Sequence, residues 1–355
     1  MSFELRIEPT GQTLEVAPDQ TVLDACLRAG LWLPHACCHG LCATCKVRVL
    51  DGEVDHGDAS PFALMDFERE EGRTLACCAT LQSDAVIEAD LEVDADARVI
   101  PVEDFHATVL ARQALTPTIL GLTLQLDRPI DFQAGQYINL AIPGLASRRA
   151  FSIASPPSLS RDGARIALQV RRVPGGAGTG WLHDTLRPGM TLDLAGPYGR
   201  FFVRSSAARP MLFIAGGSGL ASPRSMILEL LEQGDGPPIT LVVGQRCREE
   251  LYEHEDWIAR AEADPARLRY LPVLSHEPEG SAWRSLRGWA HEAARDLFDG
   301  DFRGLKAYLC GPPAMVEAAV STLMQGRLFE RDIHTEQFLS AADAQRVRSP
   351  LFRSV

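Results

Sequence analysis

The sequence predicts a multidomain chain in which an α+β part is followed by an antiparallel β-barrel and then by a doubly wound parallel α/β sheet. Three observations predict this order. A cysteine-rich loop between strand-like runs marks residues 1–98, short alternating runs separated by turns mark 99–205, and apolar runs alternating with helical segments mark 206–355. A length of 355 residues agrees with two or three domains of about 100–150 residues each.

Composition and charge exclude several classes of protein. Hydrophobic residues make up 46% of the chain, and no run approaches the ~18 apolar residues of a membrane helix. Residues 1–98 hold 19 acidic and 7 basic side chains, so they carry the whole net charge of −12. This asymmetry argues against nucleic-acid binding and favours either docking to a basic protein surface or a plain solubility surface. Without a targeting segment, the nine cysteines predict a cytoplasmic chain with reduced thiols.

The first domain is expected to combine a hairpin with two helical segments. Residues 3–7 and 14–16 alternate between apolar and polar side chains, which predicts paired strands. Residues 21–29 have apolar positions at helical spacing, with Cys26 on the apolar stripe as a core residue. Residues 46–50 predict a strand, and an acidic helical stretch follows at 65–71.

Four cysteines of this domain have the spacing of an iron–sulfur site. Cys37, Cys42 and Cys45 form C-x4-C-x2-C, and Cys77 is a distant fourth cysteine, which is the plant-type [2Fe-2S] spacing. A structural zinc site is the alternative, but zinc sites usually pair two short C-x2-C hooks, and here there is one. The x4 spacing favours Cys37 over Cys38 as the first ligand.

Over about its first hundred residues the chain resembles the β-grasp domain of plant-type ferredoxins. These chains place the fourth cluster ligand directly after a Leu-Ala pair, as at residues 75–77. The resemblance therefore implies that Cys77, rather than Cys78, is the ligand. Cys38 departs from the resemblance, because ferredoxin-like chains commonly have glycine at that position.

The second domain is expected to be a closed antiparallel barrel. Residues 122–126, 137–142 and 166–170 are three of about six short strand-like runs at barrel spacing. After them, residues 176–182 form a glycine-rich loop that runs into a short helix, which we expect Thr179 to cap. Free amides at such a helix N-terminus favour a diphosphate.

Two segments of the barrel resemble motifs of the ferredoxin-reductase family of flavoproteins. Residues 149–152 match R-x-[YF]-S, and residues 176–182 match G-x-x-[ST]-x-x-L. The resemblance implies that Arg149 binds the FAD pyrophosphate, that Phe151 lies beside the ring system and that Ser152 bonds near the reactive flavin nitrogen. It implies a diphosphate site at Gly176, Gly178 and Thr179.

The third domain is expected to bind a nucleotide at the carboxyl edge of its sheet. Residues 211–215 predict a buried strand, and further strands are expected at 239–243, 268–271 and 307–310. Ser222 is expected to cap the first helix, with Pro223 at its first position. The turn before this helix has one residue more than the common G-x-G-[IL]-x-P pattern of the same reductase family. The nucleotide-binding residues expected in this turn are Gly216, Gly217, Ser218 and Gly219.

Two later segments resemble the same family. Residues 310–313 resemble its C-G-P-P element, which implies that Cys310 lies near the nicotinamide ring and that Gly311 and Pro312 make room for it. Residues 334–338 resemble a segment beside the flavin. This implies that Glu336 and Phe338 help to form the catalytic contact region, although Phe338 also fits a core position.

The residues of the sequence do not by themselves decide between NADH and NADPH. Arg246 and Arg248 follow the second strand of the sheet, where they would suit a 2′-phosphate or lie as solvated surface charges. The resemblance favours NADH, and NADPH is possible.

Electron counting predicts the order of transfer. A nicotinamide delivers two electrons as hydride, a [2Fe-2S] cluster takes one, and flavin exchanges electrons in either number. The whole chain resembles the N-terminal-ferredoxin reductases of bacterial oxygenases. Residues 51–55, 59–66, 199–204 and 324–333 are similar to reductase components of multicomponent phenol hydroxylases. This implies electron supply from NADH, through FAD and the cluster, to a di-iron hydroxylase component on another polypeptide.

Three alternative functions are open at this point. The acceptor could be a Rieske dioxygenase or another reductive enzyme fed by the same order of domains. The chain could instead be a metal-binding interaction module with a degenerate reductase body. The third alternative is a flavin or ferric reductase with a vestigial cluster.

Overall fold

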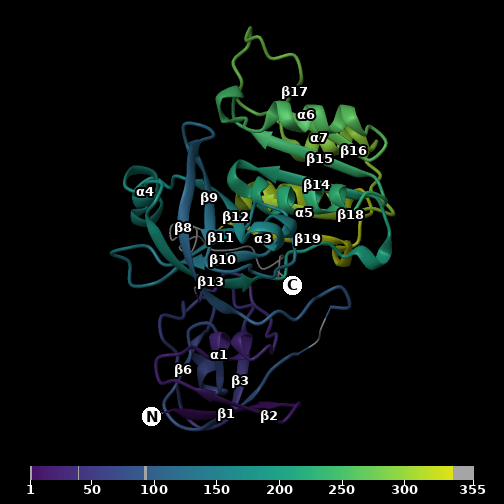
Figure 1. The fold of residues 1–355 in the computed structure, drawn as a ribbon. Helices are drawn as coiled ribbons and strands as arrows, with labels where there is room; N and C mark the ends of the chain where they lie inside the picture. The colour runs from purple at the N-terminus through teal and green to yellow at the C-terminus, as the bar shows by residue number, and fades with distance from the viewer. Residues whose placement is uncertain (1, 39, 92–93, 339–355) are drawn as a thin grey trace. The chain divides into compact units, whose positions relative to one another are not determined.

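The computed structural model describes residues 2–38, 40–91 and 94–338 (Figure 1). These residues fall into two compact units, one ending at Glu103 and one spanning Asp104–Phe338. In the described part of the chain, no helix has the length and apolar character needed to cross a membrane.

The first unit is a mixed five-stranded sheet with the order β2-β1-β7-β3-β5. β1 and β2 form the predicted hairpin, and β1 pairs with β7 in parallel. The predicted first helix is α1, whose N-cap Thr21 accepts a hydrogen bond from the amide of Asp24 at 3.3 Å. The expected β-grasp architecture is therefore confirmed. Its elements are β1 (Phe3–Glu8), β2 (Gln12–Val16), α1 (Val22–Arg28), β3 (Lys46–Asp51), β4 (Val54–Asp55), α2 (Asp66–Glu70), β5 (Arg73–Leu75), β6 (Thr80–Leu81) and β7 (Ala85–Glu88).

The second unit begins with a six-stranded antiparallel sheet in the order β11-β10-β13-β8-β9-β12. An isolated antiparallel bridge between Ile153 and Leu168 joins the end of β11 to β12, so the sheet nearly closes into the predicted barrel. Alternating inward side chains of its strands fill the interior. The elements are β8 (Glu103–Ala114), β9 (Ile119–Leu126), β10 (Tyr137–Leu140), β11 (Arg149–Ser152), α3 (Pro157–Gly163), β12 (Arg165–Arg171), α4 (Ala177–Asp184) and β13 (Thr191–Tyr198).

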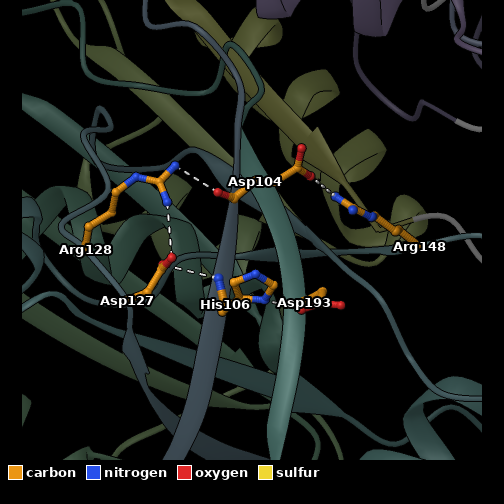
Figure 2. A network of polar contacts seen from close by, with 6 residues as sticks. All are labelled: Asp104, His106, Asp127, Arg128, Arg148 and Asp193. Carbon is orange, nitrogen blue, oxygen red and sulfur yellow. Dashed lines mark hydrogen bonds and ion pairs between the residues drawn. The ribbon is translucent and has the colours of Figure 1, made fainter. Parts of the chain in front are cut away.

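An exposed polar network ties β8 to neighbouring segments of the barrel (Figure 2). Arg128 donates to the carbonyl of Asp104 at 2.9 Å and pairs with Asp127 at 3.2 Å. Arg148 pairs with the carboxylate of Asp104 at 2.9 Å. Because these groups are solvated, each pair is expected to contribute only about 0–1 kcal/mol. The network consists of Asp104, His106, Asp127, Arg128, Arg148 and Asp193.

The rest of the second unit is a parallel six-stranded sheet in the order β17-β16-β15-β14-β18-β19, with helices on both faces (Figure 1). Phe213 of β14 packs with Ile119 and Phe201 of the barrel domain, whereas Ile214 packs toward the opposite face. This is the predicted doubly wound sheet, and its strand order reverses between β14 and β18. Its elements are β14 (Met211–Gly216), α5 (Ala221–Glu232), β15 (Ile239–Gln245), α6 (His254–Ala263), β16 (Leu268–Leu274), β17 (Leu286–Arg287), α7 (Ala290–Leu297), β18 (Lys306–Gly311), α8 (Pro313–Gln325) and β19 (Ile333–Gln337).

The predicted start of α5 was wrong. A 3₁₀ turn, Gly217–Leu220, follows β14 and continues directly into α5 at Ala221. An N-cap residue that caps with its side chain has an extended backbone, whereas Leu220, the N-cap of α5, is already helical. Ser222 is consequently inside the first turn of α5.

Candidate functional site

The loop between α1 and β3 brings the predicted cluster cysteines together as two pairs. Cys37 is hydrogen-bonded to Cys42, and Cys45 is hydrogen-bonded to Cys77. A structural zinc ion takes four ligands around one point, whereas these four cysteines make contact two by two. Two pairs fit a binuclear cluster, in which each iron takes two thiolates.

The surroundings of Cys42 suit a metal-binding thiolate. The hydrogen bond from Cys37 lowers the pKa of Cys42 to about 5, and Thr44 also donates to its Sγ at 3.2 Å. The contact with Cys45 raises the pKa of Cys77 well above its usual range. In contrast, burial raises the pKa of Cys26 to about 12, which agrees with its predicted place in the core.

The loop backbone wraps tightly at this point. Gly40 has a φ of +70°, and Cys38 and Ala43 also have left-handed backbones, with φ values of +53° and +62°. A Cβ atom at Gly40 would lie 2.7 Å from Sγ of Cys78 and 3.1 Å from Cα of Ala59. Glycine at position 40 therefore leaves the space that the Cys78 sulfur occupies.

The two flavin motifs, which are separate in sequence, meet at one end of the barrel. A Cβ atom at Gly178 of α4 would lie 3.7 Å from Cγ of Arg149 on β11, and 3.1 Å from the methyl groups of Ile142 and Leu145. The stem of Arg149 thus lies beside a helix whose first amides have no intrahelical partner. The guanidinium itself donates to the carbonyls of Ser147 and Arg148 at 2.8 and 3.1 Å. A guanidinium on a stem beside a helix N-terminus, whose amides are free, suits a diphosphate.

The predicted capping role of Thr179 was wrong. Gly176 is the N-cap of α4, and Thr179 is inside its first turn. The Thr179 hydroxyl accepts a hydrogen bond from the amide of Val173 at 3.0 Å and donates to the carbonyl of Gly176 at 3.4 Å. The side chain therefore ties the glycine loop to the helix, and the amides of the helix end stay available. Phe151 on β11 is partly buried against the barrel core.

The glycine turn after β14 lies directly against the end of β18. A Cβ atom at Gly219 would lie 2.5 Å from the carbonyl oxygen of Cys310 and 2.6 Å from Cα of Gly311. Pro312 then precedes α8 as its N-cap. The structure thus places the predicted nucleotide segments side by side at the carboxyl edge of the sheet, where open α/β sheets bind ligands.

Two side chains at this edge were not predicted. The side chain of Met315 lies against both glycine segments. A Cβ atom added at Gly216 would lie 2.5 Å from Sδ of Met315, and one added at Gly311 would lie 2.8 Å from its Cε. Arg171, at the end of β12, reaches the turn, where a Cβ atom at Gly217 would lie 2.8 Å from its Nη1. The sequence holds no motif that would identify either residue, because the contacts of Met315 with Gly216 and of Arg171 with Gly217 join segments far apart in the chain.

Ser152, Cys310 and Glu336 converge where the barrel meets the parallel sheet. Cys310 on β18 is in register with Glu336 on β19. The Ser152 hydroxyl donates to Oε2 of Glu336 at 3.4 Å, and the Cys310 thiol donates to the same oxygen at 3.7 Å. Burial raises the pKa of Cys310 well above its usual range. Phe338 packs partly buried against the core, and its amide donates to the carbonyl of Gly311 at 3.3 Å.

The Glu336 carboxyl is enclosed by these groups, although the residue as a whole is only partly buried. Burial raises its pKa to about 7, against the smaller opposing effect of its hydrogen-bond donors. A carboxyl that changes protonation near neutral pH beside a hydroxyl and a thiol can hold or release a proton during hydride transfer.

Comparisons with known proteins assign one cofactor to each of three successive parts of the chain. Residues 5–82 match the family model for 2Fe-2S iron–sulfur cluster binding domains. Residues 106–203 match the model for oxidoreductase FAD-binding domains, and residues 213–321 match that for oxidoreductase NAD-binding domains.

Similar proteins cover the full chain. The reductase component of phenol 2-monooxygenase from Pseudomonas sp. (strain CF600) is 54% identical over 100% of both chains. The phenol hydroxylase P5 protein of Acinetobacter pittii (strain PHEA-2) has the same identity and coverage. A crystal structure titled Amycolatopsis cytochrome P450 reductase GcoB has a TM-score of 0.85 at 36% identity and covers 95% of this chain and 98% of its own.

Fold and site together define an iron–sulfur flavoprotein oxidoreductase that transfers electrons from NADH through FAD and a [2Fe-2S] cluster. More particularly, the chain belongs to the family of phenol hydroxylase reductase components.

Proposed function

We propose that this protein supplies electrons to the di-iron hydroxylase component of a monooxygenase that oxidises phenol or a related aromatic. The observation that carries the proposal is the full-length similarity, at 54% identity, to two proteins named for phenol oxidation. The acidic surplus of residues 1–98 supports docking of the cluster-bearing part to a basic partner surface. We also propose a cytoplasmic location, and domains at 1–98, 99–205 and 206–355.

We propose a role for each group of site residues. Cys37, Cys42, Cys45 and Cys77 hold the cluster, with two thiolates on each iron. Arg149 and the amides at the start of α4 bind the FAD diphosphate, and FAD supplies the conversion between two-electron and one-electron transfer. The glycine turn of β14 and the Cys310–Pro312 segment receive NADH, while Ser152, Cys310 and Glu336 orient the reacting rings and handle protons.

We propose NADH rather than NADPH as the donor. The carboxylate of Glu277, from the loop after β16, accepts a hydrogen bond from the amide of Arg248 at 2.8 Å. This carboxylate lies against the loop after β15, where it would repel a 2′-phosphate and oppose the attraction of Arg246 and Arg248 for it. We expect kcat/KM for NADH to exceed that for NADPH.

An anaerobic visible titration of the purified protein with NADH tests the proposed electron path. Bleaching of overlapping flavin and iron–sulfur bands is expected with about 1.5 NADH per protein, because FAD takes two electrons, the cluster takes one and each NADH supplies two. A parallel titration with NADPH tests the donor. Flavin bleaching without cluster bands, after anaerobic reconstitution, would contradict the path and leave a flavin reductase.

The acceptor is tested separately by coupling. With a purified di-iron phenol hydroxylase component we expect NADH-dependent product formation. A second candidate acceptor is a cytochrome P450, because the GcoB structure, which covers 95% of this chain, is titled as a P450 reductase. Coupling to a P450 and not to the hydroxylase would reject the di-iron partner.

Replacing Arg149 by alanine is expected to weaken FAD retention. A charged hydrogen bond to phosphate is worth about 1.5–3 kcal/mol, so the FAD dissociation constant should rise about 10–100-fold. The fluorescence of flavin released during dialysis measures this dissociation constant. Arg148→Ala is the matched control, since this neighbouring arginine pairs with Asp104 instead. Equal FAD loss in both variants would reject the role of Arg149.

A further inference from the structure

We propose that Ser222 is a positioning residue of the electron-transfer site, which holds the Glu336 carboxylate by a hydrogen bond and favours its ionised form. The sequence pattern predicts only a capping role for Ser222, whereas the structure places it inside the first turn of α5. The proposal rests on the proposed function only for its kinetic consequence. The effect on the carboxyl itself is independent of any substrate.

The geometry ranks Ser222 first among the donors to Glu336. Its hydroxyl donates to Oε2 at 2.7 Å, whereas Ser152 donates to that oxygen at 3.4 Å and Cys310 at 3.7 Å. A bond of 2.7 Å has the ordinary length for a hydroxyl donating to an oxygen, the Ser152 bond is long, and the Cys310 thiol is a weak donor. The orientation of this carboxylate therefore depends mainly on Ser222.

Burial strengthens the effect of the Ser222–Glu336 hydrogen bond on the carboxyl. Ser222 is fully buried in the first turn of α5, and its hydroxyl is also hydrogen-bonded to the Cys310 thiol. Among the described residues, the groups that face the carboxyl are Ser222 from α5, Ser152 from β11 and Cys310 from β18, and only the Cys310 thiol titrates. A buried carboxylate has lost its hydrogen bonds to water, and a hydrogen bond from a protein donor compensates for that loss.

The sign of the effect follows from the donor. A hydroxyl that donates to a carboxylate stabilises the ionised form and lowers the pKa, in opposition to burial. Removing this hydroxyl must therefore raise the pKa of Glu336 above its value of about 7. The variant would hold its proton to higher pH, and the thiol of Cys310 would face a neutral acid at pH values where it now faces a carboxylate.

The test compares Ser222→Ala with wild type in the oxidised holoprotein. Infrared spectra of protein labelled with ¹³C-glutamate show the carbonyl band of the protonated acid, and Glu336→Gln assigns that band to Glu336. We expect the titration midpoint of the band to rise by about one to two pH units in Ser222→Ala. In stopped-flow measurements, the pH profile of flavin reduction by NADH should shift upward by the same amount.

Ser225→Ala is the matched control. Ser225 is also fully buried on α5, but its hydroxyl donates to the carbonyl of Ser155 at 2.6 Å instead of to Glu336. The proposal predicts an unchanged band midpoint in this variant. An unmoved midpoint in Ser222→Ala, or equal shifts in both variants, would overturn it. If wild type shows the band but no flavin reduction by NADH, the proposed function fails and the infrared comparison still decides the role of Ser222.

Discussion

Replacing Cys42 by alanine is expected to remove the [2Fe-2S] cluster and to reduce electron delivery to the hydroxylase to background. Cys42 is hydrogen-bonded to Cys37, which lowers its pKa to about 5, so its thiol readily becomes the thiolate that binds iron. Alanine offers no ligand, and one iron would lose half of its protein thiolates. Visible absorption and iron content measure the cluster, and NADH consumption coupled to product formation measures delivery.

Flavin chemistry should survive in the same variant. The cysteine loop belongs to the first unit, whereas the residues proposed to bind flavin and nicotinamide belong to the second. We therefore expect stopped-flow flavin reduction by NADH to be unchanged. Unimpaired delivery to the hydroxylase by Cys42→Ala would show that the cluster is vestigial.

Cys78→Ala is the control that also tests the ligand choice. The Sγ atoms of Cys77 and Cys78 are 3.7 Å apart, and only the choice of Cys77 completes the pair with Cys45. We expect Cys77→Ala to lose the cluster and Cys78→Ala to keep it. The reverse result would move the fourth ligand to Cys78.

Replacing Gly219 by alanine is expected to disrupt the nucleotide site and to destabilise the second unit. The added Cβ would lie 2.5 Å from the carbonyl oxygen of Cys310 and 2.6 Å from Cα of Gly311, and backbone atoms cannot move aside as a side chain can. Overpacking of this kind costs about 1–3 kcal/mol, which corresponds to a Tm lowered by about 2–12 °C. Displacement of the turn should slow flavin reduction by up to about a hundredfold.

Gly180→Ala is the stability control for this substitution. Gly180 is inside α4, and a Cβ atom there would meet nothing within 4 Å. Alanine in a helix interior is favoured over glycine by about 0.5–1 kcal/mol, so the variant should be slightly more stable. Thermal unfolding followed by circular dichroism compares the two. A Gly219→Ala protein with wild-type Tm and wild-type flavin reduction would show that the turn does not pack as described.

Much of the fold was predictable because the periodicity of each segment is local information. Alternation at 122–126 and 166–170 lies within β9 and β12, and the apolar run at 211–215 is β14. The parallel sheet followed from strands alternating with helices, and the barrel from closely spaced short runs. These arguments need only neighbours in sequence, since the inward face of a strand or helix repeats along the chain.

Helix starts were predicted less well. Thr179 and Ser222 are residue types that favour N-caps, yet both are inside the first turns of their helices. At α4 the flexible Gly176 takes the cap, and at α5 a 3₁₀ turn removes the extended residue that a cap requires. Capping preference is worth about 1 kcal/mol, and the packing of a turn against a neighbouring strand can exceed it.

By itself the sequence determined the order of the three domains, the cluster spacing at residues 37–45 and the cofactor motifs, because each is written in contiguous residues. Tertiary structure alone decided which of these residues meet. Cys45 is hydrogen-bonded to Cys77, the stem of Arg149 lies beside Gly178, and Ser222 donates a hydrogen bond to Glu336, which is 114 residues further along the chain. The physical reason is loop closure. Contacts between distant segments form only when whole sheets assemble around a common core, and no local pattern records which side chains then meet.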